Sequence, residues 1–99
     1  MDMFKMIKEA AAMKSKLGQI DKALREKILL VEHSGITITI NAKSEITGLK
    51  LSAEVLQRPH EKIERDVLNA IQQATKKSHD AMNEEAKKLT QGMNIPGLM

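Results

Sequence analysis

The sequence predicts an α+β protein of order α-β-β-β-α, in which a three-stranded antiparallel sheet lies between two long helices. Residues 2–27 carry apolar side chains at alternating intervals of three and four, residues 36–40 alternate strictly between Ile and Thr, and residues 60–91 return to helical spacing. The chain has 99 residues, a length that suits one domain over residues 1–99.

The first predicted helix covers residues 2–27, and its apolar residues have the spacing of the a and d positions of a coiled-coil heptad. They are Met3, Met6, Ala10, Met13, Leu17, Ile20 and Leu24. At 1.5 Å per residue this helix is about 39 Å long, whereas a compact domain of this size is about 34 Å across. We therefore expect the helix to project from the body of the protein.

Three strands are expected after this helix. They cover residues 28–33, 36–41 and 45–51. The sequence His33-Ser34-Gly35 between the first two has turn composition, and a second polar connection precedes the third strand. Such short connections join antiparallel neighbours, so the three strands form a meander.

The first strand is apolar on both faces. Ile28 and Leu30 lie on one face, while Leu29 and Val31 lie on the other. A sheet that is covered on one side only would leave apolar surface in contact with water. The strand therefore predicts a dimer, in which a second copy covers the remaining face.

The second long helix is predicted over residues 60–91, with Pro59 supplying the fixed φ that suits a first helical turn. Its first half is apolar and bulky enough to pack on the sheet. The half from residue 76 has a narrow apolar stripe and is expected to project as a rod of about 20 Å. Residues 92–99 contain Pro96 and are expected to form a loose tail.

The excess of basic residues lies in the first helix. The chain has 16 Lys and Arg against 13 Asp and Glu, and residues 1–27 hold seven basic and four acidic side chains. This stripe is interpreted either as a solvated helix face or as a surface for a polyanion, because phosphate attraction depends on the number of neutralised contacts. The candidate residues for phosphate contact are Lys5, Lys8, Lys14, Lys16, Lys22, Arg25, Lys76, Lys77, Lys87 and Lys88.

Several function classes are excluded or disfavoured by composition. The chain has no Cys, no Trp and no Tyr, so thiolate chemistry is excluded and base stacking has one aromatic residue to use. The three histidines, His33, His60 and His79, lack metal-ligand spacing, and the glycines form no phosphate loop. We expect no enzyme, no cofactor, no metal, no small-molecule substrate, no membrane segment and an intracellular location.

Two stretches resemble a known family. The helix opening MIKEAAAMK at residues 6–14 and the ending GMNIPGL at residues 92–98 are similar to the YbaB/EbfC family of bacterial nucleoid-associated proteins. The resemblance covers nearly the whole chain. It implies a cytoplasmic homodimer of α-β-β-β-α subunits, shaped like tweezers with protruding helices, that binds DNA and takes part in nucleoid organisation.

The leading hypothesis is a non-enzymatic, nucleoid-associated homodimer that binds duplex DNA mainly through phosphates and acts in nucleoid organisation or gene regulation. The alternative is a dimeric coiled-coil adaptor without DNA affinity, which binds a protein through Met3, Met6 and Met13. Salt distinguishes the two hypotheses, because phosphate binding falls steeply with ionic strength and apolar binding does not.

Overall fold

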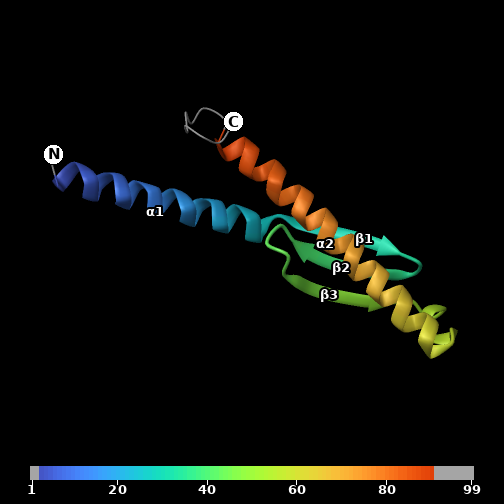
Figure 1. The fold of residues 1–99 in the computed structure, drawn as a ribbon. Helices are drawn as coiled ribbons and strands as arrows, with labels where there is room; N and C mark the ends of the chain where they lie inside the picture. The colour runs from blue at the N-terminus through green and yellow to red at the C-terminus, as the bar shows by residue number, and fades with distance from the viewer. Residues whose placement is uncertain (1–2, 91–99) are drawn as a thin grey trace.

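The computed structural model describes residues 3–90 and has the α+β order expected from the sequence (Figure 1). Its elements are α1 (Met3–Glu26), β1 (Ile28–His33), β2 (Ile36–Asn41), β3 (Ile46–Leu51), the 3₁₀ turn η1 (Val55–Gln57) and α2 (His60–Thr90). The α-β-β-β-α order and the antiparallel sheet are thereby confirmed. The tail expected over residues 92–99 lies outside the described residues.

The molecule is elongated because α1 stands away from the sheet. The radius of gyration of the Cα atoms is 19.4 Å and the longest dimension is 68 Å, whereas a compact chain of about 100 residues has a radius of gyration of about 13 Å. None of the 24 residues of α1 is buried. Figure 1 shows its N-terminal end far from the strands, as expected for a projecting helix.

The three strands pair in the order β1-β2-β3. Val31 is the partner of Ile38, which in turn pairs with Leu49, so these three residues share the face that α2 approaches. Ile28 and Leu30 belong to the opposite face. Within residues 3–90 much of this outer face is left exposed, and Leu30 is 63% exposed.

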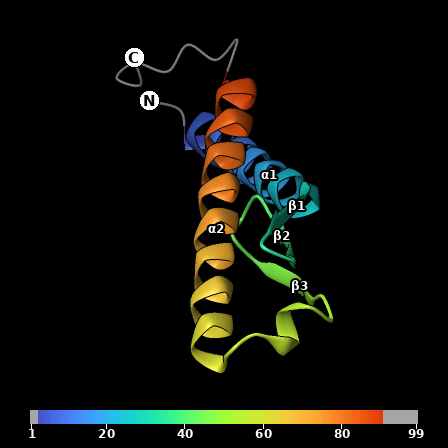
Figure 2. The same cartoon turned by 90° about the vertical axis from the view of Figure 1, so that its right-hand side faces the viewer.

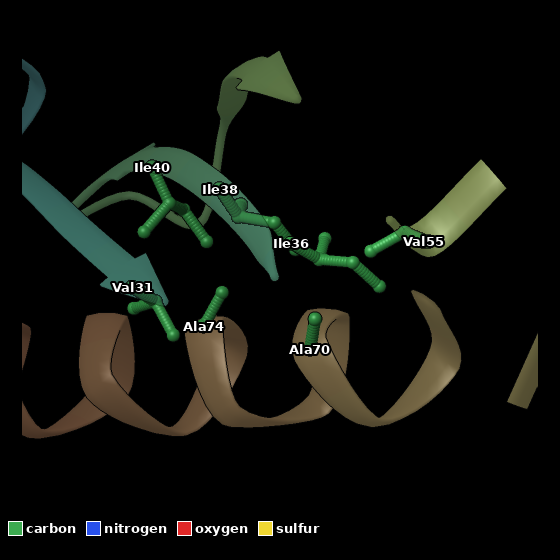
Figure 3. Close-up of a cluster of buried hydrophobic side chains, with 7 residues drawn as sticks. All are labelled: Val31, Ile36, Ile38, Ile40, Val55, Ala70 and Ala74. Carbon is green, nitrogen blue, oxygen red and sulfur yellow. The ribbon is translucent and has the colours of Figure 1, made fainter. Parts of the chain in front are cut away.

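The core lies between α2 and the inner face of β1 and β2, as the turned view in Figure 2 and the close-up in Figure 3 show. Ile36, Ile38 and Ile40 are fully buried there. They pack against Ala70 and Ala74 of α2, whose short side chains allow the helix backbone to approach the sheet closely. Alternating Ile residues on β2 and Ala residues on α2 therefore determine where the helix rests.

The free part of α2 begins later than its narrow apolar stripe predicts. Ser78 is fully buried and Ala81 is 7% exposed, although projection was expected from residue 76 onward. The Ser78 hydroxyl donates to the carbonyl oxygen of Asn41 at 2.7 Å. This bond satisfies the hydroxyl group and allows a polar residue to be buried where the helix passes the end of β2.

The β1–β2 turn is tied to the start of α2. Ser34 and Gly35 both have positive φ, 54° and 84°, a conformation that suits a tight hairpin and favours glycine. Arg58 Nη1 donates to the carbonyl oxygen of Ser34 at 2.8 Å and to Asp66 Oδ2 at 2.9 Å. The guanidinium thus joins the hairpin to the first turns of α2.

Candidate nucleic-acid interface

The N-terminal two thirds of α1 present four lysines to solvent. Lys5, Lys8, Lys14 and Lys16 are exposed, and none of them forms an ion pair with another residue in the described part of the chain. The residues from Met3 to Lys16 contain Glu9 as their single acid. This part of α1 is therefore a cationic rod whose charges form no ion pair with carboxylates of residues 3–90.

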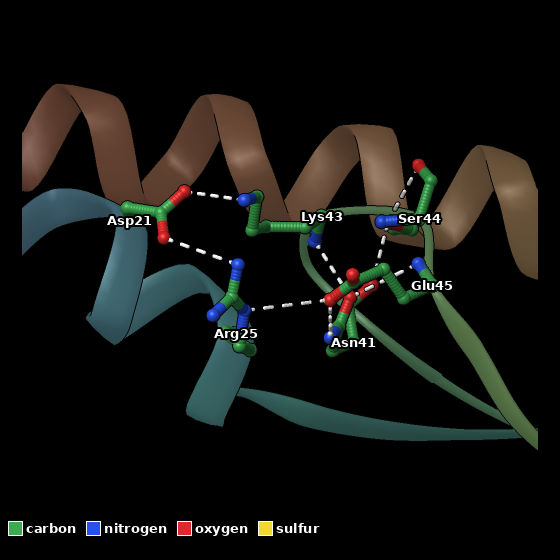
Figure 4. A network of polar contacts seen from close by, with 7 residues as sticks. Asp21, Arg25, Asn41, Lys43, Ser44 and Glu45 are labelled. Atoms are coloured by element: carbon green, nitrogen blue, oxygen red, sulfur yellow. Dashed lines mark hydrogen bonds and ion pairs between the residues drawn. The ribbon is translucent and has the colours of Figure 1, made fainter.

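The charges near the base of α1 have partners. Lys22 is 4.0 Å from Glu26 within the helix. Arg25 Nη2 is 3.4 Å from Asp21 Oδ2, and Arg25 Nε is 3.7 Å from Glu45 Oε1. Arg25 was expected with the outer, DNA-contacting face, and the structure places it against the connection between β2 and β3 (Figure 4).

The lysines of α2 differ from one another. Lys76 is exposed and makes no ion pair within the described residues. Lys77 Nζ donates to the carbonyl oxygen of Leu30 at 3.2 Å, which places it beside the edge of β1. Lys88 Nζ lies 3.8 Å from Glu85 Oε1, and Lys87 is exposed. The ammonium group of Lys76 is thus more available to a ligand than that of Lys77, which is bonded to Leu30.

Two cations outside the predicted set form contacts between distant elements. Lys27 Nζ donates to Glu85 Oε1 at 2.9 Å, and Lys43 Nζ is paired with Asp21 Oδ1. The hydrogen bond from Lys27 lowers the pKa of Glu85, and the same bond raises the pKa of Lys27. The hydrogen bond from Lys43 lowers the pKa of Asp21. No spacing in the sequence indicates these pairs, because each joins elements that meet only in the folded chain.

Apolar side chains are also exposed on α1 and on the outer face of the sheet. Ile28 is 57% exposed and Leu30 is 63% exposed. On α1 the exposed apolar residues are Met3, Phe4, Met6, Ile7, Met13 and Leu17. A single soluble chain seldom exposes so much apolar surface, so these two surfaces are candidates for contact with a second copy or another partner.

Other kinds of site find no support in the structure. Among residues 3–90, no group of three or more His, Cys, Asp or Glu side chains is arranged to hold a metal ion. His33 Nδ1 is hydrogen-bonded to Gln73 Nε2 at 2.9 Å, which gives this histidine a bond between β1 and α2. Neither helix of the described chain is both long enough and apolar enough to cross a membrane.

Comparisons with known proteins agree with this architecture. The chain is 32% identical over 100 residues to a nucleoid-associated protein of Clostridium acetobutylicum, covering 98% of this chain and 89% of that protein. It is also 32% identical over 104 residues to a nucleoid-associated protein of Afipia carboxidovorans, with 98% and 95% covered.

A solved structure has the same fold. The crystal structure of an uncharacterized protein from Helicobacter pylori matches with a TM-score of 0.69 at 18% identity, covering 94% of this chain and 97% of that one. The family model described as the YbaB/EbfC DNA-binding family matches residues 1–93. With nearly the whole sequence matched and the order of elements shared, the chain belongs to the YbaB/EbfC DNA-binding family.

Proposed function

We propose that this protein is a nucleoid-associated protein that binds duplex DNA as a homodimer, mainly through phosphate contacts made by α1. The observation that carries the proposal is the set of four exposed lysines, Lys5, Lys8, Lys14 and Lys16, on a helix that stands clear of the body. The chain belongs to a DNA-binding family, and this supports DNA as the polyanion that α1 binds. The names of the bacterial relatives support an association with the nucleoid.

Phosphate contact accounts for this surface better than base recognition does. A lysine ammonium is a compact charge that binds phosphate without a fixed geometry, whereas base recognition relies on planar groups such as the arginine fork. The exposed part of α1 carries lysines and no arginine before Arg25, whose guanidinium is already paired with Asp21 and Glu45. Such contacts position a protein on DNA and carry little sequence information.

A homodimer is proposed because the described residues leave the outer face of the sheet largely exposed. Ile28 and Leu30 on this face are both more than half exposed in the single chain. Covering them with a second copy removes apolar surface from water and places two cationic helices in one particle. Two helices double the number of phosphates that the particle neutralises, and therefore strengthen its attraction to DNA.

A salt titration of duplex binding tests the proposal. With four lysines in each of two copies, the slope of log affinity against log salt is expected to approach about −7, from about −0.9 for each phosphate contact. Changing Lys8→Gln and Lys16→Gln together removes four contacts from the dimer. The magnitude of the slope should then fall by about 3 to 4, and duplexes of unrelated sequence should be weakened alike.

The matched control changes Lys50→Gln and Arg65→Gln, which removes the same charge from exposed positions on β3 and α2. This variant should retain most of the slope. Equal losses in both variants would show that the net charge of the protein, and not α1, determines binding. A Lys8 and Lys16 variant that keeps the parent's affinity and slope would reject α1 as the DNA surface.

A second candidate function is protein binding through the apolar side of α1. The observation in its favour is the exposure of Met3, Met6 and Met13, which are spaced as a coiled-coil seam. This adaptor function predicts no duplex binding at low salt. It also predicts that changing Met6→Gln and Met13→Gln abolishes partner binding, whereas changing Lys8→Gln and Lys16→Gln has little effect.

A further inference from the structure

The contacts that hold α1 on the body are few and mostly polar. The final turns of the helix are its half-buried part, and Ile20, Ala23 and Leu24 supply the apolar contribution. The backbone nitrogen of Ala42 donates to the carbonyl oxygen of Leu24 at 3.1 Å. These contacts lie at one end of the helix, so they give little resistance to a tilt of the remaining helix.

Two ion pairs lie at the same end. Asp21 is paired with Lys43, and Arg25 is 3.7 Å from Glu45, so two consecutive turns of α1 are each joined to the connection between β2 and β3. Asp21 and Arg25 are also 3.4 Å apart. In Figure 4 the four side chains lie between α1 and the connection and point toward one another.

The connection to which these pairs attach is itself firmly held. Asn41 Oδ1 accepts from the backbone nitrogens of Lys43 and Glu45 at 2.9 and 3.0 Å, and Asn41 Nδ2 donates to Glu45 Oε1 at 2.8 Å. The backbone nitrogen of Ser44 donates to the buried Ser78 hydroxyl of α2 at 2.9 Å. The bonds therefore run without a break from α1 through residues 41–45 to α2.

From this arrangement we infer that Asp21 with Lys43, and Arg25 with Glu45, are positioning pairs that set the direction of α1 and thereby place its lysines for phosphate contact. The part of the inference that concerns phosphate contact rests on the proposed function. Lys8 lies about 20 Å from Asp21 along the helix at 1.5 Å per residue, so a tilt of about 15° moves it by about 5 Å. That displacement exceeds the length of a hydrogen bond, about 3 Å.

The direction of α1 is measured without DNA. The chain has no Cys, so Ser15→Cys and Gln72→Cys give two unique spin-label sites, both at exposed positions, one on α1 and one on α2 over the sheet. The labelled protein is mixed with an excess of unlabelled protein, so that a labelled chain in a dimer has an unlabelled partner. Both spin labels then belong to one chain. Double electron–electron resonance then reports the distribution of distances between α1 and the body.

Asp21→Ala is expected to broaden this distribution at least two-fold, because it removes the carboxylate that both Lys43 and Arg25 contact. The matched control is Glu26→Ala, which removes a carboxylate from the same end of α1 whose recorded partner, Lys22, is in the helix itself. It should leave the distribution unchanged. Asp21→Ala already removes the contact with Lys43. Adding Lys43→Ala to Asp21→Ala should therefore broaden the distribution no further.

Circular dichroism spectra that match the parent's show that broadening is not unfolding. A parent-like distribution in Asp21→Ala would overturn the inference, since α1 would then keep its direction without the pairs. Broadening of equal size in Glu26→Ala would overturn it as well, because loss of any carboxylate at this end of α1 would then be enough to broaden the distribution.

Duplex affinity provides the second readout. Asp21→Ala and Glu26→Ala both make the protein more positive by one charge, which by itself strengthens attraction to phosphate. We expect Asp21→Ala to bind at least three-fold more weakly than Glu26→Ala. If Asp21→Ala binds duplex as tightly as Glu26→Ala or more tightly, the pairs do not position α1 for DNA binding. If the parent itself fails to bind duplex, the proposed function fails, while the distance measurement still judges the direction of α1.

Discussion

Lys27 and Glu85 are 58 positions apart in the sequence, and their side chains are joined by a hydrogen bond of 2.9 Å. Lys27 follows the last residue of α1, and Glu85 lies on α2 one turn beyond the buried Ala81. The pair thus joins the start of β1 to the C-terminal part of α2. Both side chains are less than one third exposed, so solvent screens this pair less than it screens the pairs on α1.

The Lys27–Glu85 pair predicts acid sensitivity. The pKa of Glu85 is lowered from its ordinary value of 4.5 by the hydrogen bond from Lys27. A lowered pKa means that the stabilisation is present above the unfolded value and is lost as pH falls through the folded one. The pKa of Lys27 is raised from its ordinary value of 10.5, so its contribution is present at acid and neutral pH and is lost only in strong alkali. Glu85→Gln should therefore lower Tm at pH 7, and the difference from the parent should shrink as pH falls below 4.5, the ordinary pKa.

Thermal melts at a series of pH values measure this effect. Glu9→Gln, at an exposed position beyond the first turn of α1, serves as the control and should follow the parent throughout. A difference between the parent and Glu85→Gln that persists undiminished in acid would show that the substitution acts by something other than loss of this charge.

Ser78 predicts a stability loss from removal of a single oxygen atom. Its hydroxyl donates to the Asn41 carbonyl oxygen and accepts from the Ser44 backbone nitrogen. Ser78→Ala removes both bonds near the end of β2, whereas the Ser44 nitrogen and the Asn41 carbonyl oxygen keep their own bond at 3.1 Å. The expected cost is therefore that of a lost hydrogen bond, about 0.5–1.5 kcal/mol. Urea unfolding measures the loss, and Ser15→Ala on the exposed side of α1 should change the free energy of unfolding by less than about 0.5 kcal/mol.

Two glycines predict opposite outcomes for the same substitution. Gly35 has φ of +84°, and an added Cβ would lie 2.8 Å from Ser52 Oγ and 2.9 Å from Val55 Cγ2. Gly18 lies within α1 and has nothing within 4 Å of its Cβ position. Gly35→Ala should destabilise the protein by about 1–3 kcal/mol, whereas Gly18→Ala should stabilise α1 by about 0.5–1 kcal/mol. Calorimetric melts that show the same sign for both changes would contradict this account.

The order of the elements was predictable because local pattern determines it. Alternating Ile residues with intervening Thr identify β2, and the same Ile residues form the centre of the core. The exposed outer face at Ile28 and Leu30 was also expected from strand alternation alone. Periodicity reports which residues share a face, and in a short meander this suffices to identify the faces of the sheet.

The charge pairs were not predictable, because they depend on how separate elements meet. Heptad spacing places Arg25 on the outer side of α1, yet the connection that carries Glu45 folds back against that side. The narrow apolar stripe from residue 76 onward predicts a projecting helix, yet Ser78 is fully buried there. The bond to Asn41 reverses that conclusion. Partners far apart in the sequence decide whether a lysine or arginine remains available to a ligand.

Leu30 provides a test of the dimer. Leu30→Asp places a charge on a residue that is 63% exposed in the single chain, so it should be tolerated within one copy but excluded from a covered interface. The parent should sediment at about twice 11 kDa, and this variant should shift toward the single chain. Leu68→Asp, at an exposed position on α2, is the control and should remain dimeric. A folded parent that sediments as one chain at micromolar concentration would reject the dimer.

Arg25 and Lys8 carry the same charge on the same helix and are expected to contribute unequally to DNA binding. Lys8 is exposed and forms no ion pair with the described residues, so each copy gains a phosphate contact from it, and Lys8→Gln should lower the salt slope of the dimer by about 2. Arg25 is shared between Asp21 and Glu45, and a phosphate must compete with both carboxylates. Arg25→Gln should therefore change the slope by less than about 1. Fluorescence anisotropy on one duplex at five or six salt concentrations measures both slopes, and equal slopes in the two variants would show that the carboxylates beside Arg25 do not hold its charge away from DNA.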